Sequence, residues 1–209
     1  MAEIRPTPLA SRSVRLSLAI LCIAINVGLG TLVHLIKLPV YLDAVGTIAF
    51  ALFFRGTGWR GFAWAAAVGA ISFMLMGVLF NPVALWFIPT QIAIAAYAYF
   101  LAGPVLTAQL DSPTLPAMGY VRVILLGLGL GVVAGIVSAP IITFVFGGIT
   151  GAGASFITAF LLKSGETVFT SVLASGLASE PLDKLLQLAL AVVLVHNTPG
   201  RIRSAARQS

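Results

Sequence analysis

Long apolar runs, separated by short polar or glycine-rich breaks, dominate this chain. Several runs approach the roughly 20 residues that a helix needs to cross the hydrocarbon core of a bilayer. Turn signals such as Gly56, Gly58 and Asn81 followed by Pro82 separate them. The pattern predicts an all-α polytopic membrane protein that forms a single integral membrane domain over residues 1–209. Its six predicted transmembrane helices cover about residues 14–33, 41–54, 59–80, 83–103, 121–146 and 181–197.

Two segments depart from this regular pattern. The run 41–54 would give only about 21 Å of helix against a hydrocarbon core of about 30 Å, so we expect it to be shallow, tilted or shielded by its neighbours. The segment 156–178 is interrupted by charged and glycine residues at 163–166, which makes it a poor lipid-facing span. We therefore expect it to be re-entrant or packed at the outer surface. Ser179 would then cap the last helix, with Pro181 in its first turn.

Composition and charge agree with a membrane location. Hydrophobic residues make up 59% of the chain, charged residues only 9%, and the mean hydropathy is +1.07. With six spans, all nine arginines fall on one side and all three lysines on the other. The positive-inside rule then places both termini in the cytoplasm and favours six spans over seven, which would put the arginines of the tail outside. We expect a multi-pass protein of a bacterial cytoplasmic membrane, in contact with its lipids.

Several function classes find little support. The net charge of +6 comes from residues beside apolar segments, without a basic face that would indicate nucleic-acid binding. HExxH, GxSxG and Walker A motifs are absent from the sequence. His34 and His196 belong to opposite membrane faces, so they cannot share a metal, and the lone Cys22 has no partner for a disulfide. We expect neither an enzyme nor a cofactor or metal site, and no channel filter is evident.

Small residues form two kinds of pattern. Gly127, Gly131 and Gly135 place a smooth stripe on one helix face, and four glycines within 147–153 predict a loop or a cavity lining. Small-xxx-small pairs also occur on the first and third predicted helices. Such stripes serve internal helix packing or the docking of another membrane subunit. The candidate docking residues of the first helix are Ser13, Ser17, Ala24 and Gly28.

Polar residues gather on the predicted outer side, several of them inside or at the ends of apolar segments. An ionised group there is expensive unless it is paired or hydrated, so mixed charge near the glycine-rich loop suggests a pocket for a polar solute. The alternative is that lysines extend to lipid headgroups and aspartates cap helices. For any one residue the two interpretations stay open.

Three stretches together resemble the substrate-binding S components of energy-coupling factor (ECF) vitamin transporters. They are Asn26-Val27-Gly28 followed by residues 38–47 (LPVYLDAVGT), residues 140–153 with the core GGITG, and residues 180–185 (EPLDKL). The resemblance covers most of the chain. One departure is that Ala19 is followed four residues later by Ile23, where S components commonly carry a second alanine.

The resemblance implies a function and partners. The chain would capture a vitamin-like small molecule from outside, beside a transmembrane coupling subunit and two ATPase subunits that supply the energy. A multi-span sensory or cell-envelope scaffold protein is the alternative. The solute stays open among riboflavin, pyridoxine-like, thiamine-precursor, cobalamin-related and nucleobase-like molecules. The residues predicted to bind it are Lys37, Asp43, Asn81, Gln91, Thr150, Glu166, Asp183 and Lys184.

Overall fold

The computed structural model describes residues 8–38, 40–112, 117–151 and 153–207, and all regular structure within these ranges is helical. The all-α prediction is therefore confirmed. The elements are α1 (Pro8–Ile36), α2 (Val45–Phe53), α3 (Trp59–Leu79), η1 (Pro82–Phe87), α4 (Ile88–Tyr97), η2 (Ala98–Ala102), α5 (Gly103–Asp111), α6 (Ala117–Phe146), α7 (Ser155–Lys163), α8 (Val168–Asn197) and α9 (Gly200–Arg207).

Four helical runs among the described residues are long and apolar enough to cross a membrane. These runs are Arg12–Ile36, Trp59–Leu79, Pro82–Asp111 and Ala117–Phe146. They indicate a membrane protein. The other two predicted spans correspond to α2, which is short, and to α8, which carries three charged residues near its middle. The predicted span 83–103 is part of a longer helical run that continues through a π-helical turn into α5.

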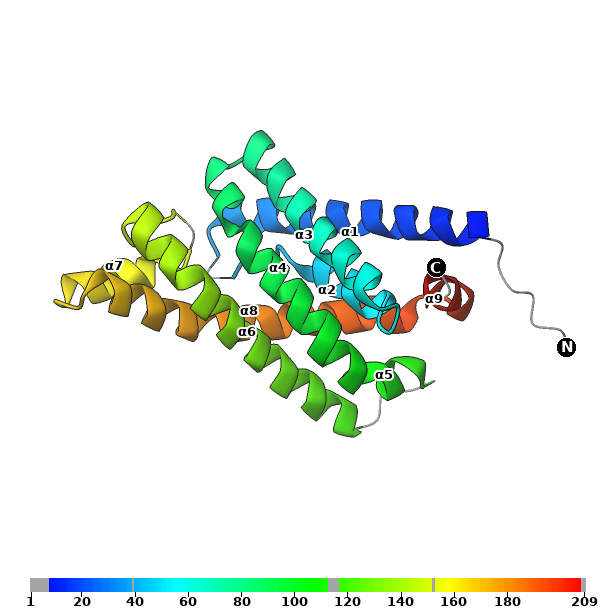
Figure 1. Cartoon of the computed structure of the whole chain (residues 1–209). Helices are drawn as coiled ribbons and strands as arrows, with labels where there is room; N and C mark the ends of the chain where they lie inside the picture. The colour runs from blue at the N-terminus through cyan, green and yellow to red at the C-terminus, as the bar shows by residue number, and fades with distance from the viewer. Residues whose placement is uncertain (1–7, 39, 113–116, 152, 208–209) are drawn as a thin grey trace, which may run out of the picture.

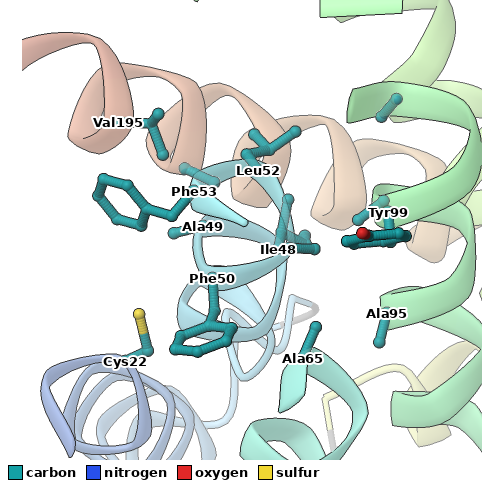
Figure 2. Close-up of a cluster of buried hydrophobic side chains, with 14 of the residues drawn as sticks. Cys22, Ile48, Ala49, Phe50, Leu52, Phe53, Ala65, Ala95, Tyr99 and Val195 are labelled. Carbon is teal, nitrogen blue, oxygen red and sulfur yellow. The ribbon is translucent and has the colours of Figure 1, made fainter. Parts of the chain in front are cut away.

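The short helix α2 lies at the centre of the bundle, and all nine of its residues are buried. Figure 2 shows Ile48, Phe50 and Leu52 of α2 among side chains from the surrounding helices, including Cys22 of α1 and Tyr99 of η2. This helix meets protein on all sides, so its length need not match the thickness of a bilayer. Of the three alternatives expected from the sequence, shielding by neighbours describes the observed packing.

The first turn of α2 is capped by side chains from other helices. Ala44, at its N-terminal boundary, provides no side-chain cap. The backbone N–H groups of Ala44 and Gly46 instead donate to Gln187 Oε1 of α8 at 2.8 Å and to Asn26 Oδ1 of α1 at 2.7 Å. Free N–H groups at a buried helix start need such partners. These contacts fix α2, and with it the loop before it, between α1 and α8.

The glycine stripe of α6 is the contact surface for α8. A Cβ at Gly127 would come within 2.6 Å of Leu185 Cα, and one at Gly131 would clash with the backbone of Pro181. Gly135 continues the same face. Because these glycines have no side chains, the two 30-residue helices can pack backbone against backbone along this face.

The predicted boundary of the last helix is wrong. Helix α8 begins at Val168, where the Thr167 hydroxyl accepts from the backbone of Thr170 as a cap. Ser179 lies inside this helix and donates to the carbonyl of Ser175 at 2.9 Å. The polar interruption at 163–166 is a turn between two helices, in which Gly165 has a φ of 95°. Residues 156–178 thus form most of α7 and the first turns of α8, and the predicted re-entrant segment is not confirmed.

The bundle has two distinct ends (Figure 1). The described start of α1 lies at one end with α5 and α9, and α7 lies at the opposite end. At the α7 end, the glycine-rich loop that follows α6 meets the loop between α1 and α2, since a Cβ at Gly153 would clash with the backbone of Leu38. This contact brings together two loops that are far apart in the sequence.

Candidate functional site

A cavity of about 270 Å³ lies toward the α7 end of the bundle. Its walls come from the end of α1, the second half of α3, η1, α4, α6 and α8. Loop residues Leu38, Val40, Tyr41, Asp43, Thr150 and Gly153 complete the lining. Most of its lining is apolar. The larger apolar side chains are Phe73, Met76, Phe87, Ile94 and Ile142. Small-molecule sites have this general character, with a few polar groups placed among apolar walls.

One side of the cavity is charged, and Lys184 is the centre of that charge. Its Nζ lies 3.2 Å from Glu180 Oε2 and 3.8 Å from Asp43 Oδ1, and it donates a hydrogen bond to Asp183 Oδ2. The ring of Tyr41 lies 5.4 Å away on another side. We call Asp43, Glu180, Asp183 and Lys184 the Lys184 cluster. Its three α8 residues are buried although they lie near the middle of a long helix.

Asp183 holds the loop before α2 against α8. Its Oδ1 accepts from the backbone N–H groups of Tyr41 at 2.8 Å and Leu42 at 3.0 Å, and its Oδ2 accepts from Gln187 Nε2 at 2.7 Å. Leu42 has a φ of 50°, an uncommon conformation for a leucine. Asp183 is fully buried and does not line the cavity. Its contacts give it the role of positioning Tyr41 and Asp43 at the cavity wall.

A second polar network connects α1 to the cavity. Asn26 Nδ2 donates to Thr47 Oγ1 at 2.9 Å and to Ser72 Oγ at 3.0 Å. Thr47 Oγ1 in turn donates to Oε1 of Gln91, which lines the cavity. All four side chains are buried, so the chain of hydrogen bonds satisfies groups that would otherwise be costly in an apolar interior. It also fixes the orientation of the Gln91 amide.

The structure separates the residues that the sequence predicted as solute ligands. Five of them line the cavity: Asp43, Asn81, Gln91, Thr150 and Lys184. Asp183 lies behind this surface, whereas Lys37 and Glu166 are exposed and lie outside the lining. Glu166 belongs to the turn between α7 and α8. Binding of a solute by these residues stays a prediction. Only the five that line the cavity are placed where they could contact a molecule bound in it.

Sequence reasoning left several residues of the site out of the predicted set. Glu180 lies one helical turn before Lys184 and pairs with it, so the i, i+4 spacing was an available signal. Thr90 and Tyr41 also line the cavity. Asn26 and Gln187 act from other helices through their bonds to α2, and a single sequence gives no signal for such long-range pairing.

The predicted docking residues of α1 all face outward. Ser13, Ser17, Ala24 and Gly28 are exposed, and a Cβ at Gly28 would meet no atom within 4 Å. The small residues Gly61 and Gly69 of α3 behave differently. Gly61 and Gly69 are buried there, and a Cβ at Gly69 would lie 3.1 Å from Gln91 Cβ. Internal packing therefore explains Gly61 and Gly69 of α3 but not the small residues of α1.

Arginines gather at the other end of the bundle. Asp111, at the end of α5, pairs with Arg55 at 2.9 Å and with Arg207 of α9, and Arg203 of α9 donates to the carbonyl of Leu110. We call Arg55, Asp111 and Arg207 the Asp111 cluster. Burial, together with the charge of Arg207, lowers the pKa of Arg55 to about 10, so this guanidinium stays charged at neutral pH.

Candidate metal sites do not occur in the described ranges, where no group of three or more His, Cys, Asp or Glu side chains is placed to hold an ion. Comparison of the chain with known protein families, with curated proteins and with solved structures found no match.

Proposed function

We propose that this chain is the substrate-capture subunit of an ECF-type importer and that it binds a vitamin-like small molecule in the cavity beside Lys184. The cavity is the observation that carries this proposal. It combines apolar walls with a few buried polar groups, and its exposed rim residues His34, Leu35, Leu38 and Phe80 mark a route to the surface.

The proposed topology has six crossings with both termini in the cytoplasm. In addition to the four apolar runs, it uses α2, which is shielded from lipid, and α8. Three charges of α8 argue against a lipid-exposed span, yet all three are buried and ion-paired inside the protein. The Asp111 cluster lies at the end of the bundle that carries the arginines, which the positive-inside rule assigns to the cytoplasm. The cavity then opens toward the outside.

The partners in this proposal are a transmembrane coupling subunit and two ATPase subunits. The given sequence carries no Walker A motif, so this proposal assigns ATP hydrolysis to other subunits. The exposed small residues of α1 are the proposed docking face, because small side chains allow another helix to approach closely.

Mass spectrometry of the purified protein tests the binding function. The protein, purified in detergent without added ligand and then denatured, is expected to release one small molecule in near-stoichiometric amount. Ala84→Trp places a large ring at the cavity wall and should abolish this release, whereas Ala174→Trp, at an exposed position of α8, should not. Release of no specific molecule, or equal release from the Ala84→Trp variant, contradicts the proposal.

Co-purification tests the partners. Tagged protein from its native membrane should bring down a coupling subunit and ATPase subunits. Gly28→Leu should lower their yield several-fold while leaving small-molecule binding intact, and Ala174→Leu serves as the control for an exposed small residue on another helix. Recovery of cell-wall enzymes in place of ATPases would instead support the scaffold alternative.

A further inference from the structure

Several buried polar atoms with incomplete hydrogen bonding belong to residues that line the cavity. Among the described side chains, the buried hydroxyl oxygens of Thr31 and Thr90 have no hydrogen bond. Asp43 Oδ1 and Glu180 Oε2 have no donor besides the ammonium of Lys184 with which they pair. All four residues line the cavity. A buried acceptor without a donor costs free energy, and native proteins keep few of them. Two unpartnered hydroxyls and two carboxyl oxygens that share one ammonium, all at the same cavity, favour a bound partner that brings further hydrogen-bond donors.

The charge of the site is also unbalanced. Three carboxylates share the single ammonium of Lys184, and the two oxygens of Asp183 are already occupied by backbone and side-chain donors. Glu180 has only its ion pair with Lys184, although its side chain is 8% exposed. Arginine is absent from the described lining, and His34 at the rim lies next to Asn81. The cavity wall therefore carries more carboxyl groups than ammonium groups.

We infer that the cavity takes a small organic cation, a protonated amine or a cationic nitrogen heterocycle with an apolar or aromatic body, whose nitrogen binds Glu180 and Asp43. This inference rests on the proposed function and narrows the class of its substrate. A cation satisfies both observations at once, because it brings a second positive charge and further N–H donors to carboxyl groups that share the single ammonium of Lys184.

The rest of the cavity suits the body of such a molecule. Phe73, Phe87 and Met76 lie along the apolar part of the lining, where aromatic faces favour a nearby cation and thioethers adapt to irregular shapes. A volume of about 270 Å³ is enough for a compound of one or two rings. An anion would meet the carboxylates of Glu180 and Asp43 at close range, so the same site excludes acids.

Matched ligands test the charge requirement. Pyridoxamine carries a protonated aminomethyl group where pyridoxine carries a hydroxymethyl group, and benzylamine, benzyl alcohol and benzoate form a second series of similar size. Calorimetry and thermal unfolding of the ligand-free protein in detergent should show that each cation binds at least tenfold more tightly than its neutral counterpart, with no binding of benzoate. The inference is overturned if neither pyridoxamine nor benzylamine binds, or if the neutral compounds bind as tightly as the cations.

Variants locate the charge contact. Glu180→Gln keeps the shape but removes one of the excess charges, so the ligand-free protein should keep or raise its melting temperature while its affinity for the cation falls roughly 10- to 100-fold. A purely structural role for Glu180 would lower the melting temperature instead. Thr90→Val should weaken binding, whereas Thr143→Val removes an equally unpaired buried hydroxyl outside the cavity and should not.

The two proposals fail in different ways. If the small molecule that co-purifies with the protein is neutral or anionic at pH 7, the cation inference is wrong and the capture function stands. If the protein releases no small molecule and none of the test ligands binds, the capture function fails as well.

Discussion

The Lys184 cluster and the Asp111 cluster are opposites in charge and in surroundings. In the first, three carboxylates share one ammonium, and in the second, two guanidiniums share one carboxylate. The side chains of the α8 residues in the Lys184 cluster are at most 8% exposed, whereas that of Asp111 is 40% exposed. Each cluster contains more of one charge than it can pair within the protein.

The difference lies in how the excess charge can be compensated. Water, counterions and anionic headgroups can neutralise the surplus of arginine at an exposed end of the bundle, so that cluster is complete without a specific ligand. Water reaches the buried carboxylates beside Lys184 far less easily, and an unpaired charge there is expensive. One cluster is therefore suited to fastening helix ends, and the other to selecting a bound molecule.

Removing Lys184 should have the largest effect. Lys184→Met leaves three carboxyl groups, two of them buried, without a cation, and breaking a buried ion pair in this way costs about 3–5 kcal/mol of stability. We expect a large fall in melting temperature, or loss of folded protein, in detergent. Adding Glu180→Gln and Asp43→Asn to Lys184→Met should recover part of the loss, because fewer carboxylates then lack a partner. An unchanged melting temperature of the single variant would mean that the carboxylates do not depend on Lys184.

Asp183→Asn should rank second. The amide oxygen can still accept from Tyr41 and Leu42, but the new NH₂ group would face the donors of Gln187 and Lys184. Loss of charged hydrogen bonds predicts about 2–3 kcal/mol of destabilisation. Faster hydrogen exchange of the peptide that contains residues 40–44 should accompany it, because Asp183 holds that loop. Glu180→Gln, the same change one turn away, is the control and should show neither effect.

The sequence predicted those features of the fold and of the candidate site that follow from local pattern. Apolar runs predicted an all-α chain, Gly127, Gly131 and Gly135 predicted a smooth helix face, and the glycines of 147–153 predicted a loop or a cavity lining. Mixed charge in the stretch 180–185 indicated a polar site, although the role given to Asp183 as a solute ligand does not agree with its position behind the cavity wall.

The errors share a physical cause, which is that tertiary contacts override local signals. Ser179 and Pro181 are typical of a helix start, yet α8 continues through them because its face there packs on Gly131. Likewise, Asn26 and Gln187 cap α2 although they lie 20 or more residues from it in the sequence. No local feature of the α2 segment therefore indicates these caps. The grouping of Thr31, Thr90, Asp43 and Glu180 at one cavity depends on the same long-range packing and is visible only in three dimensions.

Asp111→Asn should have the smallest effect of the three and gives the sharpest comparison with Lys184→Met, since each removes the only opposite charge of its cluster. Arg55 loses its carboxylate partner but keeps its bond to the carbonyl of Leu52 at 2.6 Å. Because Asp111 is partly exposed, water replaces much of the lost interaction, and we expect Asp111→Asn to lower the free energy of unfolding by about 1–2 kcal/mol.

Unfolding in 0.15 M and 1 M salt should show that screening shrinks the effect of Asp111→Asn on stability but leaves the effect of Lys184→Met almost unchanged. Arg207→Gln, which spares the Arg55 pair, should cost less than about 1 kcal/mol. An Asp111→Asn effect as large and as insensitive to salt as that of Lys184→Met would remove the distinction between the clusters, and with it the argument that only the Lys184 cluster needs a ligand to balance its charge.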